Sequence, residues 1–560
     1  MKSTDYIIVG SGPAGSTLAA RLSENISSTV LLLEAGGSDR KLTIIMPAAI
    51  PFTYTNPRLS WGEWAGAEPA LNGMMIDEKR GRVLGGGSSI NAMIFNRGNA
   101  KDFNGWAQQG ANGWSYDDVL PYFKRMETFS EGPTQYRGGE GPLKIIRCPA
   151  KHKFFDTFLR SGEQAGYQIA SDHNGEEQEG IHIAQAYIDK GRRCNASHAY
   201  LHPNKDRQNL AVKTNSHVHR VLFEQNRAIG IQLVTGEKQF ANKEVIIAAS
   251  TVGAAKLLML SGVGPAELLR EHDISVVANL PQVGQNLENH PGVNLQYSTK
   301  HEYSIVSELG LFGQAKLGLQ WMLTRKGLGA GNFFEAGGFV RANDQVDYPN
   351  VQFEFLPLVR YVANGKLKVI PGFQLWIDLS RPESRGAVTL TSSDPMAAPK
   401  IVFNHLQAQR DCDDLINSIR MAREIFSQPV WDGIRGKEIQ PGAELKTDAE
   451  ILAWMKTAVG TSYHTSGTCR MSTSAEDGVV DSACRVHGLE GLRVVCAAVM
   501  PQIVTANLSA TTYMIAEKIS DEIRGMSPQK LRSIVDDSLQ GAKFPGVKTA
   551  PSTYFAPTLI

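Results

Sequence analysis

The chain has 560 residues, more than a single hydrophobic core usually organises, so two or more domains are expected. Hydrophobic residues make up 42% and charged residues 20%, as in ordinary globular proteins, and the formal net charge is +1. This balance leaves no basic surface for nucleic acid, and no apolar window of about 18 residues predicts a membrane-spanning helix.

The cysteines and the first residues indicate a compartment. None of the six cysteines forms a CxxC pair, so neither a zinc site nor a dithiol motif is expected, and we predict no metal. The first predicted strand begins close to Met1, without the basic and apolar stretches of a secretory signal. We therefore expect a cytoplasmic protein with reduced thiols. Peripheral association with the inner face of the membrane and a homodimer are both compatible with the sequence.

Residues 5–36, DYIIVGSGPAGSTLAARLSENISSTVLLLEAG, predict a strand, a glycine turn, a helix and a second strand over 30–33. Gly10, Gly12 and Gly15 form GxGxxG, which permits a tight turn and lets the backbone approach a pyrophosphate. Glu34 ends the second strand, where a carboxylate can bind both hydroxyls of a ribose. An acid there disfavours a 2′-phosphate, so FAD or NAD is favoured over NADP.

Beyond Gly36 the sequence predicts several further segments. Residues 41–64 predict an irregular excursion, and residues 80–98 a second glycine turn followed by a segment with helical spacing. Residues 213–247 are β-rich and residues 250–260 helical. Residues 300–455 alternate strands and helices without a nucleotide signal, and are the candidate substrate domain.

Near the C-terminus the pattern returns to that of a nucleotide domain. "LRVVCAAVMP" predicts a buried strand and "LSATTYMIAEKISDEIR" a helix, followed by a proline-containing tail. The predicted FAD-binding domain is therefore discontinuous. We expect it to comprise residues 1–155, 205–300 and 456–525, with substrate-domain segments 156–204 and 301–455 and a tail at 526–560.

Three segments carry a resemblance to a known family. These are "GRVLGGGSSINAMIFNRG", "STVGAAKLLMLSGVG", and "YHTSGTCRM" followed by "VMPQIVTANLSATTYMIAEK". The second matches in part, because Ala254 and Ala255 stand where the family usually has Ser or Thr and then Pro. Together they resemble the glucose-methanol-choline (GMC) oxidoreductases over nearly the whole chain, with a pattern most similar to choline dehydrogenases and bacterial FAD-dependent alcohol dehydrogenases.

The resemblance implies an α/β fold with a Rossmann-like FAD-binding domain and a discontinuous α+β substrate-binding domain. It also implies oxidation of a primary alcohol to an aldehyde by hydride transfer to flavin N5. Ile90 stands where some members carry a histidine joined to the flavin, so the FAD is expected to be non-covalent. The residues that the resemblance assigns to FAD are Gly10, Gly12, Pro13, Ala14, Gly15, Glu34, Ala35, Arg82, Gly85, Gly86, Ser88, Asn91, Ala92, Val218, Ala497 and Asn507.

The resemblance places His464 at the family's catalytic histidine and Asn507 at its partner. A histidine has a pKa close to neutral pH, which suits a base that removes a hydroxyl proton, and an amide can hold the oxygen. His290, in "GQNLENHPG", is a further candidate for the site. The histidines interpreted as structural or surface residues are His198, His202, His217, His219 and His405.

Two further positions bear on substrate and cofactor. Glu335, in "NFFEAGGF", corresponds to a carboxylate of choline dehydrogenases and is a candidate for substrate binding, together with His464 and Asn507. Cys496 replaces an aspartate that in the family helps to hold the flavin, which puts tight retention of FAD in question.

The sequence leaves alternatives open for the substrate and for the function. The substrate could be choline itself, the protein could be a lyase of the same fold that retains FAD, or a scaffold that has lost flavin. The flavin spectrum separates these classes: an alcohol bleaches the flavin of an oxidoreductase, the flavin of a lyase stays unchanged, and a scaffold is colourless. The resemblance favours a quinone or another carrier over oxygen as the electron acceptor, and an alcohol as the small-molecule substrate.

Overall fold

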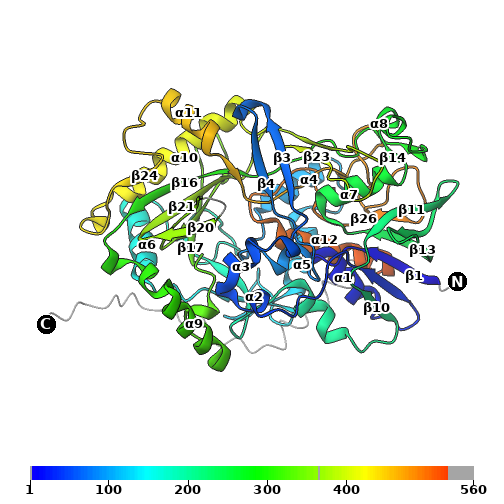
Figure 1. The fold of residues 1–560 in the computed structure, drawn as a ribbon, viewed down its shortest axis with the longest axis horizontal. Helices are drawn as coiled ribbons and strands as arrows, with labels where there is room; N and C mark the ends of the chain where they lie inside the picture. The colour runs from blue at the N-terminus through cyan, green and yellow to red at the C-terminus, as the bar shows by residue number, and fades with distance from the viewer. Residues whose placement is uncertain (1–2, 364–365, 527–560) are drawn as a thin grey trace.

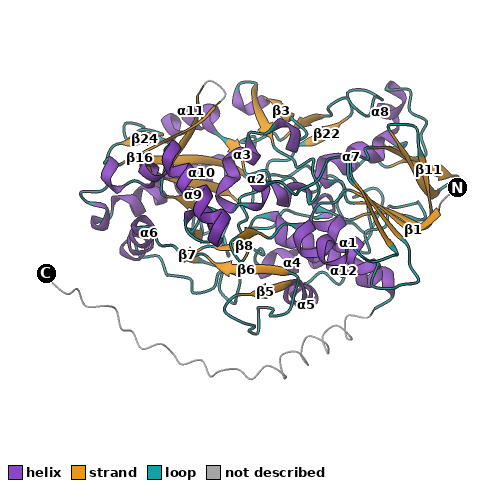
Figure 2. Cartoon of the chain, turned by 60° about the horizontal axis from the view of Figure 1, so that its bottom comes forward, coloured by secondary structure: helices purple, strands orange, loops and turns teal. Residues whose placement is uncertain are grey.

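The structure is a computed structural model that describes residues 3–363 and 366–526. Within these residues two seven-stranded sheets organise the chain, each with helices packed against it. Figure 1 shows the first sheet with α1 and α12 on the right, and the second with α6 and α10 on the left. The same two halves are seen in the turned view of Figure 2.

The first sheet carries the nucleotide motif. Its strands are in the order β10-β2-β1-β13-β12-β11, and β26 pairs with the end of β13. Strands β10, β2, β1, β13 and β26 are parallel, whereas β11 and β12 are antiparallel to their neighbours. Their bounds are β1 Ser3–Val9, β2 Val30–Leu33, β10 Leu210–Lys213, β11 Val218–Glu224, β12 Arg227–Leu233, β13 Lys238–Ile247 and β26 Leu492–Val494.

Helix α1 (Pro13–Leu22) follows the first glycine turn and packs beside α12 (Leu508–Arg524). Both helices bury most of their residues, and β2 and the C-terminal ends of β1 and β13 are apolar and buried, as expected for a parallel sheet covered on both faces. Because β1 and α12 come from opposite ends of the described chain, this half of the molecule is built from both ends of the sequence.

The second sheet is antiparallel, in the order β24-β16-β21-β18-β17-β7, and β25 pairs with β16. Helices α6 (Lys153–Gln164) and α10 (Gln409–Ser427) cover one face, where Phe355 stacks on Phe158. Alternate residues such as Glu354 point to the other face. The strand bounds are β7 Gly180–Ile183, β16 Pro291–Ser298, β17 Ala336–Val340, β18 Val351–Leu356, β21 Gly372–Leu379, β24 Glu438–Gln440 and β25 Gly460–Thr461.

The remaining elements connect or flank the two halves. No helix among the described residues is long and apolar enough to cross a bilayer. The bounds are α2 Leu42–Ile45, α3 Ile50–Tyr54, β3 Glu63–Glu68, β4 Met74–Glu78, α4 Ala100–Gln108, α5 Tyr116–Met126, β5 Glu127–Phe129, β6 Leu143–Arg147, β8 Gln185–Asp189, β9 Arg192–Arg193, α7 Ser250–Leu260, β14 Val263–Gly264, α8 Ala266–Glu271, β15 Ala278–Asn279, α9 Leu311–Thr324, β19 Val359–Ala363, β20 Lys366–Ile370, β22 Ala387–Thr389, β23 Lys400–Val402 and α11 Asp448–Ala458.

The predicted fold class is confirmed, and the strand at 30–33 and the helices at 250–260 and 508–524 have the predicted bounds. The predicted helical segment after the second glycine turn is wrong. Only a 3-10 turn, Gly86–Ser89, forms there, and the chain then runs alongside β8, where Phe95 N–H donates to the Gln185 carbonyl. "LRVVCAAVMP" is a strand only over Leu492–Val494. The predicted tail lies outside the described residues except for Met526.

Candidate active site

A cavity of about 1310 Å³ lies between the two halves. Val9 and Glu34 of the first sheet line it, and Glu354 and Trp376 of the second sheet line it from the opposite side. Pockets for drug-sized molecules have volumes of about 300–1,000 Å³. The cavity is therefore large enough for a dinucleotide together with a second, smaller molecule.

The two glycine turns form one wall of the cavity. Gly10 has a φ of +100°, and a Cβ atom there would meet the Ala248 carbonyl oxygen at 2.5 Å. A Cβ atom on Gly86 would approach Gly12 Cα to 2.7 Å, so the turns touch where they line the cavity. A Cβ atom on Gly12 would meet no atom within 4 Å and would point into open space. The wall thus exposes backbone, which is the surface that a pyrophosphate requires.

The Glu34 carboxylate lies beside this wall and is almost completely buried. Its oxygens accept hydrogen bonds from Ser11 Oγ at 2.6 Å and from the Gly36 N–H at 2.8 Å. Burial raises the pKa of the carboxyl, and these hydrogen bonds oppose the rise. The side chain is thereby held in a fixed position at the end of β2, facing the cavity, where a ribose would meet it.

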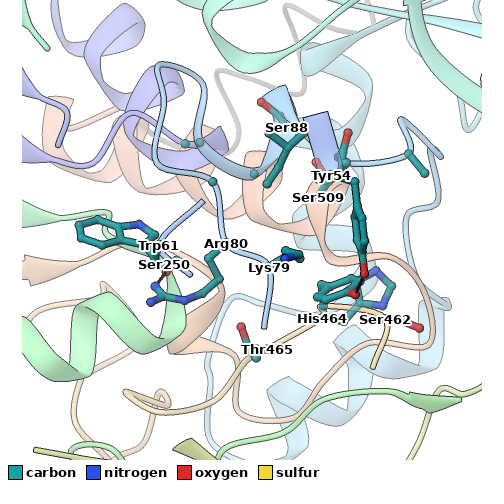
Figure 3. Close-up of a pocket in the computed structure, with 18 of the residues that line it drawn as sticks. Tyr54, Trp61, Lys79, Arg80, Ser88, Ser250, Ser462, His464, Thr465 and Ser509 are labelled. Atoms are coloured by element: carbon teal, nitrogen blue, oxygen red, sulfur yellow. Dashed lines mark hydrogen bonds between the residues drawn. The ribbon is translucent and has the colours of Figure 1, made fainter. Parts of the chain in front are cut away.

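Trp61, Arg80 and Ser250 form a cluster at the cavity wall. Figure 3 shows this cluster away from His464. Arg80 Nη1 donates to Ser250 Oγ at 2.9 Å, and the guanidinium lies over the Trp61 ring. His217 packs edge-on against Trp61 and also lines the cavity. His217, interpreted from the sequence as a structural or surface residue, thus lies at the cavity wall, because the turn before β11 brings it there.

Most of the residues predicted to hold FAD do line the cavity. These are Gly10, Gly12, Pro13, Ala14, Glu34, Ala35, Gly86, Ser88, Asn91, Ala92, Val218, Ala497 and Asn507. Three predicted cofactor residues do not. Gly15 packs against the Gly10 carbonyl, Arg82 stacks on Trp61, and Gly85 donates its N–H to Ser11 Oγ behind the turn. Their effect on a cofactor is therefore indirect, through the shape of the wall.

The pairing of β16 with β25 brings two histidines together at the other end of the cavity. His290 directly precedes β16, and His464 follows β25 by three residues. Pro291 pairs with Thr461, so the segments beyond them run side by side. The backbone N–H of His464 donates to Asn289 Oδ1 at 2.9 Å, which holds the loop after β25 in place. His290, a candidate from the sequence, is therefore in direct contact with His464.

The hydrogen bonds of Asn507 determine which nitrogen of His464 carries the proton. Asn507 Oδ1 accepts from Asn96 Nδ2 at 2.7 Å and from Gln352 Nε2 at 3.1 Å. Its Nδ2 must therefore point the other way, and it donates to His464 Nε2 at 3.2 Å. Nε2 is then the unprotonated nitrogen, and His464 Nδ1–H donates to His290 Nδ1 at 2.9 Å. Burial lowers the pKa of His464 to about 3, which keeps the ring neutral.

The sequence interpretation missed Glu354, which lies beside this pair. Glu354 Oε1 accepts from Asn507 Nδ2 at 3.2 Å and from Gln352 Nε2 at 2.9 Å. Burial raises its pKa, and the pKa of Asp378 on the adjacent strand is raised by burial and by the Glu354 charge. The signal was present in "VQFEFL", where polar residues alternate with apolar ones, as in a strand with one polar face.

Glu335 does not take the predicted place in the site. It is not among the residues that line the cavity, and its Oε2 accepts from the Ala150 N–H at 2.7 Å. On β18 the alternation places Glu354 on the cavity face, whereas Glu335, just before β17, is turned toward the segment before α6. Glu335 therefore does not line the cavity in which we predicted it to bind substrate, whereas Glu354 does.

A glycine-lined wall for a dinucleotide and a histidine–asparagine pair at the far end define a flavin-dependent oxidoreductase. The chain matches profiles of the GMC oxidoreductase family over residues 4–292 and 382–516. It is 43% identical over 530 residues to the oxygen-dependent choline dehydrogenase of Brucella suis, covering 94% of this chain and 96% of that protein. The chain therefore belongs to the GMC oxidoreductases.

Further relatives agree with this assignment. The oxygen-dependent choline dehydrogenase of Yersinia pseudotuberculosis is 43% identical over 535 residues, which cover 94% of each chain. The structure resembles formate oxidase from Aspergillus oryzae (TM-score 0.86, 25% identity, 94% and 98% of the two chains). It also resembles pyridoxine 4-oxidase from Mesorbium loti (TM-score 0.83, 27% identity, 94% and 100%). The protein is an FAD-dependent oxidoreductase that acts on CH–OH groups, and the glycine wall and Glu34 fit that cofactor.

Cys496 lies against the FAD side of the cavity and is buried. Burial raises the pKa of its thiol to about 12, and the backbone N–H groups of Ala498 and Ser250 face the sulfur. The position therefore offers two amide donors to an uncharged side chain. A carboxylate placed there would find hydrogen-bond partners that the thiol uses only weakly.

We predict that Cys496→Asp retains more FAD during purification than the parent protein. If the introduced carboxylate makes the hydrogen bond that the family's aspartate makes with the flavin, it adds about 1.5–3 kcal/mol to FAD binding. This corresponds to roughly tenfold or more in FAD affinity. The measurement is the ratio of flavin to protein absorbance, with the neutral Cys496→Ser as the matched control. Equal or lower occupancy in Cys496→Asp would contradict the prediction.

Proposed function

We propose that the protein oxidises a primary alcohol to an aldehyde, with His464 as the general base and Asn507 as the group that holds the oxygen. The observation that supports this most is the His464 Nε2 to Asn507 Nδ2 contact of 3.2 Å, in which Nε2 is an acceptor. An unprotonated imidazole nitrogen beside an amide donor matches an alcohol, which has one proton to lose and an oxygen to be held, once the alcohol oxygen replaces the contact between them.

The proposed chemistry begins when the alcohol oxygen enters between these two groups. His464 Nε2 takes the hydroxyl proton, and the Asn507 N–H donates to the oxygen as negative charge develops on it. Bound FAD supplies the hydride acceptor at flavin N5. The substrate carbon is oriented by the cavity walls.

His290 has a positioning role in this proposal. Its Nδ1 accepts the Nδ1–H of His464, which fixes the tautomer with Nε2 free. Burial and the neighbouring His464 ring hold the pKa of His290 well below its usual value, so it stays neutral. A neutral acceptor stabilises the imidazolium that forms on His464, whereas a second cation there would oppose its formation.

A choline-specific dehydrogenase is the second candidate, and Glu354 is the observation that favours it. The Glu354 carboxyl lines the cavity beside Asn507, and Trp376, Phe333 and Phe334 also line it. A carboxylate with aromatic faces suits a quaternary ammonium group. The relatives named above are choline dehydrogenases by their names.

The acceptor and the cellular location belong to the proposal as well. The names of the relatives and of the solved structures support oxygen, whereas the sequence resemblance favoured a quinone or another carrier. We propose a quinone-type acceptor with oxygen as the alternative, and a cytoplasmic protein associated peripherally with the membrane. A homodimer, non-covalent attachment of the FAD and the domain boundaries stay predictions.

We predict that His464→Ala slows anaerobic reduction of the flavin by about 10²–10⁴-fold at saturating substrate, the usual contribution of a general base. Asn507→Ala should slow it less, because it removes one hydrogen bond and leaves the base. Stopped-flow absorbance of the bound flavin measures both. His405→Ala is the control, since His405 is buried but lines no part of the cavity.

The outcome that contradicts this assignment is a His464→Ala protein that keeps its flavin and reduces it at nearly the parent rate. His290 would then be the next residue to test as the base, since it is the adjacent histidine in the hydrogen-bonded pair.

If the protein is a choline-specific dehydrogenase, we predict that Glu354→Gln raises the KM for choline roughly tenfold or more. The KM for hexanol should rise much less. The substitution removes the charge and keeps the shape, so a cationic alcohol loses an attraction that an uncharged one never had. Steady-state kinetics with both alcohols measure the difference. Equal changes in the two KM values would reject a cation-binding role for Glu354.

A further inference from the structure

Helix α9 separates the cavity from solvent and has two different apolar faces. On the inner face Leu317 and Trp321 are buried, and Gln314 and Gly318 line the cavity. On the outer face Phe312 is 94% exposed, Leu311 86% and Leu323 76%. Figure 1 shows α9 at the outer edge of the molecule, beside the second sheet. Soluble proteins rarely leave so many large apolar side chains of one helix in water.

Exposed apolar side chains also occur among the residues that line the cavity. Five further large apolar side chains are both exposed and part of the cavity lining, and they come from α3, β3, β4, β19 and β20. They are Phe52, Trp64, Met75, Tyr361 and Val369. We call these five residues and the outer face of α9 the apolar rim. Apolar groups therefore form part of the cavity lining that is exposed to solvent.

The charges around α9 indicate which partner the rim fits. Between residues 309 and 330 the charged residues are Lys316, Arg325 and Lys326, all cationic. Lys316 and Lys326 are exposed on either side of Leu319, and the acidic Glu308 lies just before this segment. Aromatic and aliphatic residues with flanking lysines are typical of helices that lie in the plane of a lipid surface. A second copy of this face would instead bring like charges together.

We propose that the apolar rim docks on a membrane surface that contains anionic lipids, with the mouth of the cavity against the bilayer. Phe312, Leu319 and Leu323 would enter the acyl boundary, while the lysines remain at the headgroups. An apolar electron acceptor of the quinone class would then enter the cavity from the lipid phase. That last step rests on the proposed function, whereas the docking surface rests on α9 and the rim alone.

The experiment is flotation of the FAD-loaded full chain with vesicles of phosphatidylcholine, with and without phosphatidylglycerol. Binding is expected to the vesicles that contain phosphatidylglycerol, and to fall as salt rises. The double variant Leu311→Gln, Phe312→Gln should lower the partition coefficient at least tenfold. The double variant Lys316→Gln, Lys326→Gln should lower it about fivefold for each charge removed.

Ile26→Gln is the matched control, because Ile26 is 86% exposed, as is Leu311, but lies outside the cavity and the rim. It should bind vesicles like the parent protein. Oxidation of alcohol with a soluble dye as acceptor should be unchanged in all these variants, since none of the substituted residues lines the cavity. Loss of vesicle binding with normal dye reduction therefore separates the membrane proposal from the proposed function.

Two results would overturn the proposal. The first is that the parent chain does not bind vesicles that contain phosphatidylglycerol, or binds them equally well after Leu311→Gln, Phe312→Gln. The second is a dimer in analytical ultracentrifugation that the same double variant dissociates, which would assign the face to a second copy of the chain.

Discussion

The active site depends on the hydrogen bonds made by the two nitrogens of the His464 ring. Asn507 donates to one nitrogen and His290 accepts from the other, so the ring is held in one orientation and one tautomer. His290 is fully buried and Asn507 partly buried, and the orientation of Asn507 is set in turn by Asn96 and Gln352. A neutral histidine fixed in this way has its unprotonated nitrogen next to Asn507 at the cavity wall before any substrate arrives.

This arrangement requires both halves of the molecule. Asn507 begins α12, which packs in the first half, whereas His290 and His464 are held by β16 and β25 of the second sheet. The polar face of the same sheet presents Glu354 to the cavity, and its apolar face is covered by α6 and α10. The site therefore forms only where an FAD-binding half and a substrate half meet, which explains why the chain alternates between them.

The sequence predicted local features well and contacts between distant segments only in part. The glycine turn, Glu34 and the helix that starts at Leu508 follow from short-range patterns. The contact of His290 with His464 depends on strands separated by more than 160 residues. The alternation in "VQFEFL" indicates a polar face for Glu354, but the position of that face at the cavity follows only from the pairing of β18 with β21. The apparent helix after the second glycine turn failed because tertiary pairing with β8 outweighed a local periodicity.

The central claim is that an alcohol gives hydride to the flavin while His464 takes its proton. Anaerobic mixing of the FAD-loaded protein with a primary alcohol and with the same alcohol deuterated at the reacting carbon tests it most directly. The account predicts that the flavin absorbance is lost with both, and more slowly with the deuterated alcohol. A flavin spectrum that choline, hexanol and benzyl alcohol all leave unchanged would contradict it.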